Sequence, residues 1–198
     1  MVYSDKGLNG MSQIYHKFYQ NNLIRSKFAF KPRPILINNW EATFFDFNEE
    51  KLLELADKAS KAGIELFVLD DGWFGHRDND DSSLGDWFED KRKLPNGLKS
   101  LSEKIHEKGM DFGLWFEPEM ISEDSELYKK HPEYVLHTEG RPYTYGRGQL
   151  VLDLSKDEVC DYVIDSVSKI LKSANINYVK WDMNRHLTDV GNFELGIE

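Results

Sequence analysis

The chain has 198 residues and a formal net charge of −10, from 25 Lys and Arg against 35 Asp and Glu. This length allows one domain with a sizeable core, and the mixed composition excludes a disordered or fibrous chain. The acidic balance argues against binding to nucleic acid or to an anionic membrane, because both are negatively charged. No apolar run is long enough to span a membrane and the first residues lack the apolar core of a signal peptide, so we expect a cytoplasmic protein. The one cysteine, Cys160, cannot form an internal disulfide and is expected to be a small core residue.

Residues 1–34 have helical rather than strand periodicity. Their apolar side chains predict a helix over residues 12–24 with a wide aromatic face, formed by Ile14, Tyr15, Phe18, Tyr19 and Leu23. Such a face needs something to pack on. Pro32 and Pro34 then break the chain before the first strand.

From residue 35 onward, short apolar strands alternate with amphipathic helices. Strands are predicted at residues 35–37, 65–69, 111–116 and 177–182. Helices are predicted from Asn48 to Gly63, from Leu98 to Gly109 and from the Ser155 region to Ala174. Ser155 and Glu158 have the spacing of a capping box for the last of these helices. The segment between the third strand and that helix is long and irregular, with a brief extended piece at residues 150–154.

This alternation predicts an α/β fold built from parallel βαβ units with right-handed crossovers. It suits a (β/α)8 barrel, in which functional residues gather at the carboxyl ends of the strands. A doubly wound open sheet is the rival, but no GxGxxG turn follows the first strand and no P-loop is present. Four units make half a barrel, so we expect residues 35–198 to form the N-terminal half of a (β/α)8 barrel and residues 1–34 to form a helical linker.

Carboxylates directly follow two of the predicted strands. Lys180 and Asp182 share one strand face, where the cation is expected to keep the aspartate ionised, and an ionised carboxylate can act as a nucleophile. A structural salt bridge is the alternative. Asp70 and Asp71 can hydrogen-bond vicinal hydroxyls or hold a metal ion; metal is disfavoured because no His or Cys cluster lies near them in sequence. Turn-forming or helix-capping aspartates are the alternative reading of this pair.

Five tryptophans are many for this length: Trp40, Trp73, Trp87, Trp115 and Trp181. Core packing is their usual role, yet flat apolar faces beside carboxylates also suit the C–H face of a sugar. Arg147 stands between two glycines and can bind a hydroxyl or a carboxylate through its planar fork. The run at residues 78–81 resembles part of a calcium loop, but Ser83 occupies the place where an EF-hand requires glycine, so a solvated loop is expected.

Six ordered motifs, spread from about residue 8 to residue 190, resemble the catalytic domain of the α-galactosidases of glycoside hydrolase family 36. They are Ile37-Asn-Asn-Trp-Glu-Ala-Thr, Leu69-Asp-Asp-Gly-Trp-Phe-Gly, Gly85-Asp-Trp, Phe112-Gly-Leu-Trp-Phe-Glu-Pro-Glu-Met, Gly148-Gln-Leu-Val-Leu-Asp-Leu and Tyr178-Val-Lys-Trp-Asp-Met-Asn-Arg. The resemblance implies a retaining enzyme that hydrolyses terminal α-D-galactosides of the raffinose and melibiose type without a cofactor, in a homo-oligomer.

The resemblance also assigns roles. Asp182 is the implied nucleophile, and Asp70 and Asp71 are implied to bind the galactose 4- and 6-hydroxyls. The remaining implied substrate-binding residues contact other hydroxyls or wall the sugar site: Trp40, Trp115, Arg147, Lys180 and Asn184.

The family members are longer, with a β-sandwich domain before the barrel and an acid/base aspartate after the nucleophile. No carboxylate after Asp182 lies in a matching motif; Asp189, Glu194 and Glu198 follow in a polar tail. We therefore expect a segment that carries the nucleophile without the acid/base, preceded by a linker to a β-sandwich, and inactive on its own until the C-terminal half completes it. Should the isolated chain prove active, Glu117 and Glu119 are the first acid/base candidates.

Half a barrel is expected to expose two edge strands and the inner faces of its strands, and so to associate. The residues expected to face water or another chain are Phe67, Leu69, Leu114 and Val179. Two other functions stay open: a non-catalytic galactoside-binding or interaction module, and a metal-dependent hydrolase that uses Asp70 and Asp71.

Overall fold

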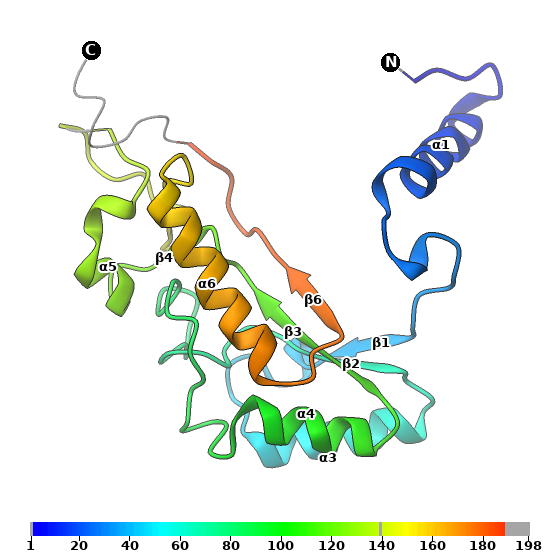
Figure 1. Ribbon diagram of the computed structural model, residues 1–198, viewed down its shortest axis with the longest axis horizontal. Coiled ribbons are helices and arrows are strands. Elements are labelled where there is room, and N and C mark those ends of the chain that lie inside the picture. Colours follow the sequence, from blue (N-terminus) through cyan, green and yellow to red (C-terminus); the bar gives the residue numbers. More distant parts are fainter. Residues whose placement is uncertain (1, 139, 189–198) are drawn as a thin grey trace. The chain divides into compact units, whose positions relative to one another are not determined.

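The computed structural model describes residues 2–138 and 140–188 and divides into two compact units, between Ile35 and Leu36. Figure 1 shows the chain coloured from the N-terminus in blue to the C-terminal part in red. The polar tail at Asp189, Glu194 and Glu198 lies outside the described residues.

The N-terminal unit is helical, as the aromatic periodicity predicts. Helix α1 spans Gly7–Phe18 and continues as a π-helical turn at Tyr19–Leu23, and a 3-10 turn follows at Lys27–Ala29. The helix begins five residues before the predicted start; Ser12, which we took as the first residue, lies inside the helix and donates its hydroxyl hydrogen bond to the carbonyl of Leu8. None of the residues of α1 is buried, so its aromatic face is exposed.

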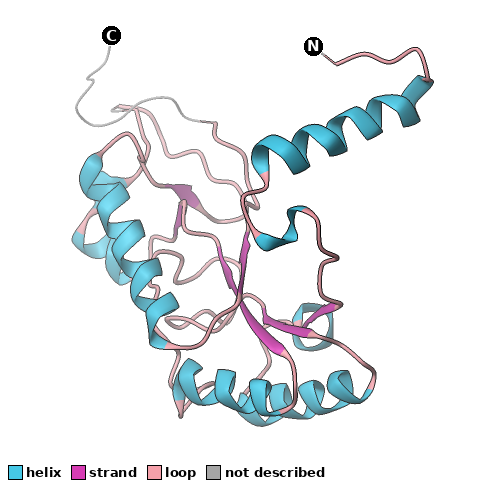
Figure 2. Ribbon diagram, turned by 45° about the vertical axis from the view of Figure 1, so that its right-hand side comes forward, coloured by secondary structure: helices cyan, strands magenta, loops and turns pink. Residues whose placement is uncertain are grey.

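The second unit contains a parallel sheet in the order β1-β2-β3-β6, the predicted arrangement of four βα units. The strands are β1 Leu36–Asn38, β2 Leu66–Leu69, β3 Asp111–Phe116 and β6 Tyr178–Trp181. The helices are α2 Trp40–Thr43, α3 Glu49–Lys61, α4 Gly97–Glu107, α5 Glu126–Lys130 and α6 Asp157–Ser173, with a 3-10 turn at Pro132–Tyr134. Figure 2 shows α3 and α4 side by side along the sheet.

Helix α3 begins as predicted, whereas α6 does not. The side chain of Asn48 accepts a hydrogen bond from the backbone N–H of Lys51, so Asn48 is the N-cap of α3. The capping box at Ser155 was a wrong prediction, because the N-cap of α6 is Lys156, which makes no side-chain cap. The hydroxyl of Ser155 instead donates to Asp153 Oδ1 at 2.6 Å, a partner two residues upstream.

The irregular segment after β3 holds a second, small sheet. Strands β4, Met120–Ile121, and β5, Leu150–Val151, pair in an antiparallel manner, so the predicted extended piece at residues 150–154 is a two-residue strand. The buried carboxylate of Asp86 accepts the first backbone N–H groups of α5 and thereby ties this segment to the loop after β2.

The core lies between the sheet and helices α3, α4 and α6, which contribute to one hydrophobic cluster. Phe67, Leu69 and Leu114 are fully buried in this cluster, so the prediction that they face water or another chain was wrong. Their strand neighbours Val68 and Gly113 are the residues on the opposite, inner face of the sheet. Because the strand period is two, the prediction had assigned the two faces in reverse.

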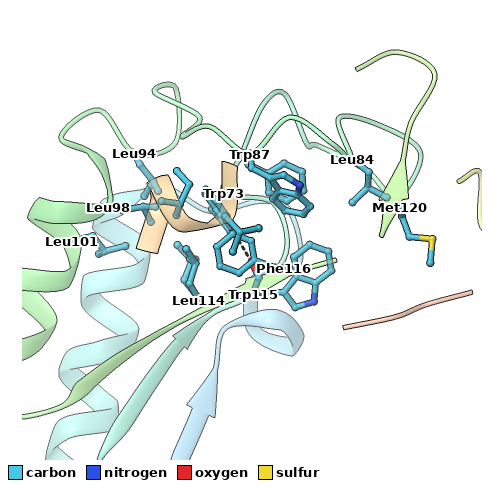
Figure 3. Packing of buried hydrophobic residues seen from close by; sticks show 14 of the residues in the cluster. Trp73, Leu84, Trp87, Leu94, Leu98, Leu101, Leu114, Trp115, Phe116 and Met120 are labelled. Carbon is cyan, nitrogen blue, oxygen red and sulfur yellow. Dashed lines mark hydrogen bonds between the residues drawn. The ribbon is translucent and has the colours of Figure 1, made fainter. Parts of the chain in front are cut away.

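Aromatic rings fill the end of the core next to the carboxyl ends of the strands. Figure 3 shows Trp73, Trp87, Trp115 and Phe116 gathered there, and Trp73 Nε1 donates to the backbone carbonyl of Trp115 at 2.9 Å. The rings of Phe74 and Trp115 are stacked, with centroids 6.1 Å apart. This packing fixes the backbone of β3 where the strand ends.

Among residues 2–138 and 140–188, the structure contains no helix that is both long and apolar enough to span a membrane.

Candidate active site

Asp182 follows β6 directly, and neighbouring groups fix its carboxylate. Trp115 Nε1 and Asn184 Nδ2 donate to its Oδ2 at 3.0 and 3.1 Å, and the N–H of Met183 donates to its Oδ1 at 2.9 Å. Burial alone would raise the pKa of Asp182, but these hydrogen bonds and the charge of Lys180 hold the pKa below its usual value. Asp182 is therefore an ionised, oriented carboxylate.

Lys180 pairs with Asp70 rather than with the aspartate on its own strand. Its Nζ lies 2.9 Å from Asp70 Oδ2. The charge of Lys180 still lowers the pKa of Asp182, as expected, but it adds to the hydrogen bonds from Trp115, Asn184 and Met183. The other oxygen of Asp70 accepts the N–H of Asp71. The N–H of Asp70 donates to the buried side chain of Asn39 at 2.8 Å, which holds the end of β2 against the turn after β1.

Asp71 is buried and paired with Arg77. Arg77 Nε lies 3.0 Å from Asp71 Oδ1, and the terminal nitrogen Nη2 lies 2.8 Å from Oδ2. Burial raises the pKa of Asp71, and the guanidinium opposes that rise. Nε also lies 3.2 Å from Oδ2, so Oδ2 receives two of the Arg77 donors, and Oδ1 retains a lone pair that can accept a hydrogen bond from a hydroxyl group.

All eight residues predicted for the site line one cavity of about 160 Å³ at the carboxyl ends of the strands. They are Trp40, Asp70, Asp71, Trp115, Arg147, Lys180, Asp182 and Asn184, and Asp80 is the ninth lining residue. The volume is below the roughly 300–1,000 Å³ of pockets for drug-sized ligands, as suits one small polar ring. Other hollows are larger, but those described in the second unit run along α2, α3 and α4 and are lined mostly by charged and polar side chains.

Two residues near the cavity were missed by the sequence analysis. Asp80, which we placed in a solvated loop, pairs through Oδ1 with Arg147 at 2.9 Å, so two loops meet at the rim. Arg77 lies in the same polar loop and is almost fully buried. No periodicity marks either residue: Arg77 bonds groups within six residues of it inside an irregular loop, and Asp80 pairs with Arg147, which is 67 residues away.

Glu117 and Glu119 lie outside the lining of this cavity. Glu117 Oε1 accepts the N–H of Asn184 at 2.5 Å; burial raises the pKa of Glu117, and the charge of Asp182 adds to the rise. Glu119 Oε1 accepts a hydrogen bond from Trp181 Nε1 at 2.8 Å. Among the residues described, no three His, Cys, Asp or Glu side chains are grouped to hold a metal ion.

The fold and this site define the class of protein. Four parallel βα units carry acidic, basic and tryptophan side chains at the carboxyl ends of their strands, the arrangement of part of a (β/α)8 enzyme barrel. The sequence profile of the Melibiase family matches residues 1–198, and the chain belongs to this family.

Relatives and solved structures agree with that membership. The chain is 60% identical over 198 residues to the alpha-galactosidase AgaA of Geobacillus stearothermophilus and 57% identical over 190 residues to the alpha-galactosidase Mel36A of Lactobacillus acidophilus. These matches cover 100% and 96% of this chain but only 27% and 26% of the relatives. The chain thus spans about a quarter of their length.

The structural comparison gives the same coverage. The crystal structure of the GH36 enzyme AgaA has a TM-score of 0.94 at 61% identity and covers 98% of this chain, which corresponds to 27% of the AgaA chain. A variant of AgaA has been solved in complex with raffinose, with a TM-score of 0.93 and 60% identity over the same shares of the two chains. The predicted fold, four βα units of a barrel enzyme, is confirmed.

Proposed function

We propose that this chain forms the nucleophile-bearing half of the catalytic barrel of a retaining α-galactosidase. The observation that carries the proposal is the carboxylate of Asp182, ionised and fixed by three hydrogen bonds in a cavity shared with Asp70, Asp71 and Lys180. A fixed, ionised carboxylate can attack an anomeric carbon and form a glycosyl-enzyme intermediate. The lowered pKa keeps Asp182 in the attacking form at neutral pH.

The proposed substrate is a terminal α-D-galactoside of the raffinose or melibiose type. Asp70 and Asp71 are proposed to accept the galactose 4- and 6-hydroxyls, because adjacent carboxylates can bind two neighbouring hydroxyl groups. Lys180, Arg147 and Asn184 would bind other hydroxyls, with Trp40 and Trp115 as the walls of the ring site. The raffinose complex of the relative AgaA supports this substrate class.

The proton donor is proposed to come from residues outside this chain. Retaining hydrolysis needs a second carboxyl group about 5–5.5 Å from the nucleophile. Neither Glu117 nor Glu119 is among the described residues that line the cavity, which speaks against both as the acid. We further propose a cytoplasmic homo-oligomer in which residues 1–34 link the barrel to an upstream β-sandwich domain.

Azide rescue tests the nucleophile in the full-length protein, meaning this chain expressed with all residues that flank it in its gene. Asp182→Gly is expected to abolish turnover of an aryl α-galactoside, and added azide should restore it by forming β-galactosyl azide, since azide enters from the face that the carboxylate occupied. Asp70→Gly is the matched control: it should also lose activity, but azide should not restore it. Formation of the α-azide would show that Asp182 is not the nucleophile.

A non-catalytic galactoside-binding module is the second candidate, favoured by the presence of the complete predicted sugar site beside a single candidate catalytic carboxylate. Calorimetry of the full-length protein with galactose and with glucose tests it. Galactose binding without turnover by the full-length protein would support the module. Failure to bind either sugar would exclude it.

A further inference from the structure

The side chain of Arg77 uses every nitrogen of its guanidinium inside the protein. Nε and Nη2 donate to the carboxylate of Asp71, while Nη1 donates to the backbone carbonyls of Asp80 at 2.7 Å and Ser82 at 2.8 Å. The side chain is only 1% exposed. One planar group therefore fixes a carboxylate and two points of a loop simultaneously.

The surroundings of Arg77 leave it little freedom to move. Its guanidinium carbon lies 5.7 Å from the ring centroid of Phe45 and 5.9 Å from that of Phe74. The ammonium group of Lys93 bonds the backbone carbonyls of Arg77 and Gly72 at 2.7 and 2.9 Å. Both ends of the arginine are thus anchored, one by aromatic rings and the other through its own backbone.

Of the three residues that the Arg77 guanidinium bonds, Asp71 and Asp80 line the cavity. Asp71 follows β2 at the base, and Asp80 reaches the rim, where it pairs with Arg147 from the segment after β3. The charged groups that act on Asp71 are Arg77, Asp70 and Asp80, and Lys180 neutralises Asp70. Arg77 is the one cation in direct contact with Asp71 among the described residues.

We propose that Arg77 is a positioning residue for galactose recognition: it orients the Asp71 carboxylate toward the sugar and sets the position of Asp80 opposite Arg147. This inference rests on the proposed function, because it assumes that the cavity binds galactose. Lysine cannot replace arginine here, since one ammonium group cannot span a carboxylate and two carbonyls in a planar fork. Arg77 itself is not among the residues that line the cavity.

The experiment compares Arg77→Lys and Arg77→Met with wild type in the full-length protein. Calorimetry gives the dissociation constants for galactose and glucose, thermal unfolding gives the midpoint, and an aryl α-galactoside gives kcat and KM. Arg92→Lys is the matched control. The guanidinium of Arg92 also forms ion pairs with two aspartates, Asp78 and Asp90, but its side chain is 59% exposed.

We expect Arg77→Met to weaken galactose binding on the order of 100-fold and Arg77→Lys about tenfold, because the buried Asp71 carboxylate loses the hydrogen bonds from the guanidinium group. The preference for galactose over glucose should also fall, since the two sugars differ at the 4-hydroxyl and Asp71 belongs to the aspartate pair proposed to bind the 4- and 6-hydroxyls. Arg92→Lys should change both constants less than about threefold, as for other surface substitutions.

Each outcome decides between positioning and mere structural support. If Arg77→Lys unfolds at a lower temperature yet keeps wild-type galactose affinity and preference, the inference is overturned, and the same holds if both Arg77 variants fail to fold. If Arg77→Met alone fails to fold, Arg77→Lys gives the answer. Wild-type protein that neither binds galactose nor turns over substrate overturns the proposed function together with this inference. Wild-type binding without hydrolysis overturns only the hydrolytic function and leaves Arg77 tested through the dissociation constants.

Discussion

The indole nitrogen of Trp115 donates a hydrogen bond to Oδ2 of Asp182 at 3.0 Å. Trp115 lies on β3 and Asp182 follows β6, and these strands are neighbours in register, Trp115 opposite Lys180. The backbone of Trp115 is in turn held by the indole of Trp73. The buried aromatic cluster thus reaches the candidate nucleophile through one hydrogen-bond donor.

Trp115→Phe should keep the aromatic packing but remove that donor. This hydrogen bond helps to hold the pKa of Asp182 low, so the pKa should rise when the donor is lost. The acid limb of the pH profile of kcat/KM should then move to higher pH. We expect kcat/KM of the full-length protein at neutral pH to fall about tenfold or more, the effect of losing one hydrogen bond to a charged group. Trp181→Phe is the control: its indole donates to Glu119 outside the cavity, and its acid limb should not shift. An unchanged acid limb in Trp115→Phe would contradict the assignment.

Glu117→Gln should reduce the loss of folding stability that occurs as the pH rises. The pKa of Glu117 is raised in the folded state by burial, so the folded protein keeps a proton that the unfolded chain releases first. Wild type therefore has its full stability below the unfolded pKa, about 4.3, and loses part of it as the pH rises toward the folded value. Gln does not titrate, and its carbonyl oxygen can still accept the N–H of Asn184.

Urea unfolding of both proteins between pH 4 and 8 measures this difference. The free energy of unfolding of Glu117→Gln minus that of wild type should increase with pH and then level off. A difference that stays flat would mean that Glu117 titrates alike in the folded and unfolded states.

The sequence predicted the parts of this protein that depend on local pattern. The strands ending at Asp70 and Asp182 were found because apolar runs end in carboxylates, and the start of α3 at Asn48 was found because the change to helical periodicity is a local pattern. The partners of Lys180 and Asp71 were not found, since Asp70 lies 110 residues from Lys180 and Arg77 lies in a polar loop without periodicity. The capping box at Ser155 failed for a different reason, because a local acceptor, Asp153, accepts the hydrogen bond of the Ser155 hydroxyl group.

Asp86→Ala should destabilise the segment after β3. The Asp86 carboxylate is buried and accepts the N–H groups of Glu126 and Leu127 at 2.9 and 3.1 Å, so it caps α5 from a distant loop. Loss of hydrogen bonds to a charged acceptor should cost about 1.5–3 kcal/mol in the free energy of unfolding. Ser125→Ala removes the local cap of the same helix and should cost about 1 kcal/mol. Equal losses in the two variants, measured by denaturant unfolding, would mean that Asp86 adds nothing beyond an ordinary cap.

The last prediction concerns association of the 198-residue chain on its own. Strands β1 and β6 are the two edges of the four-stranded sheet, and Leu36 and Tyr178 on them are 40% and 41% exposed. Their register partners Leu66 and Gly113 on the neighbouring strands are buried, so the exposed apolar side chains lie at the two edges, next to unpaired backbone groups. We expect the isolated chain to form oligomers or aggregates at micromolar concentration, visible by light scattering, and to cleave no aryl α-galactoside.

Tyr178→Lys should reduce the scattering, because a charge on an edge strand opposes strand pairing. Ile164→Lys, at a more exposed apolar position on α6 away from the sheet edges, should leave the scattering unchanged. A monodisperse monomer with a cooperative melt would show instead that the open edges of this sheet do not drive association.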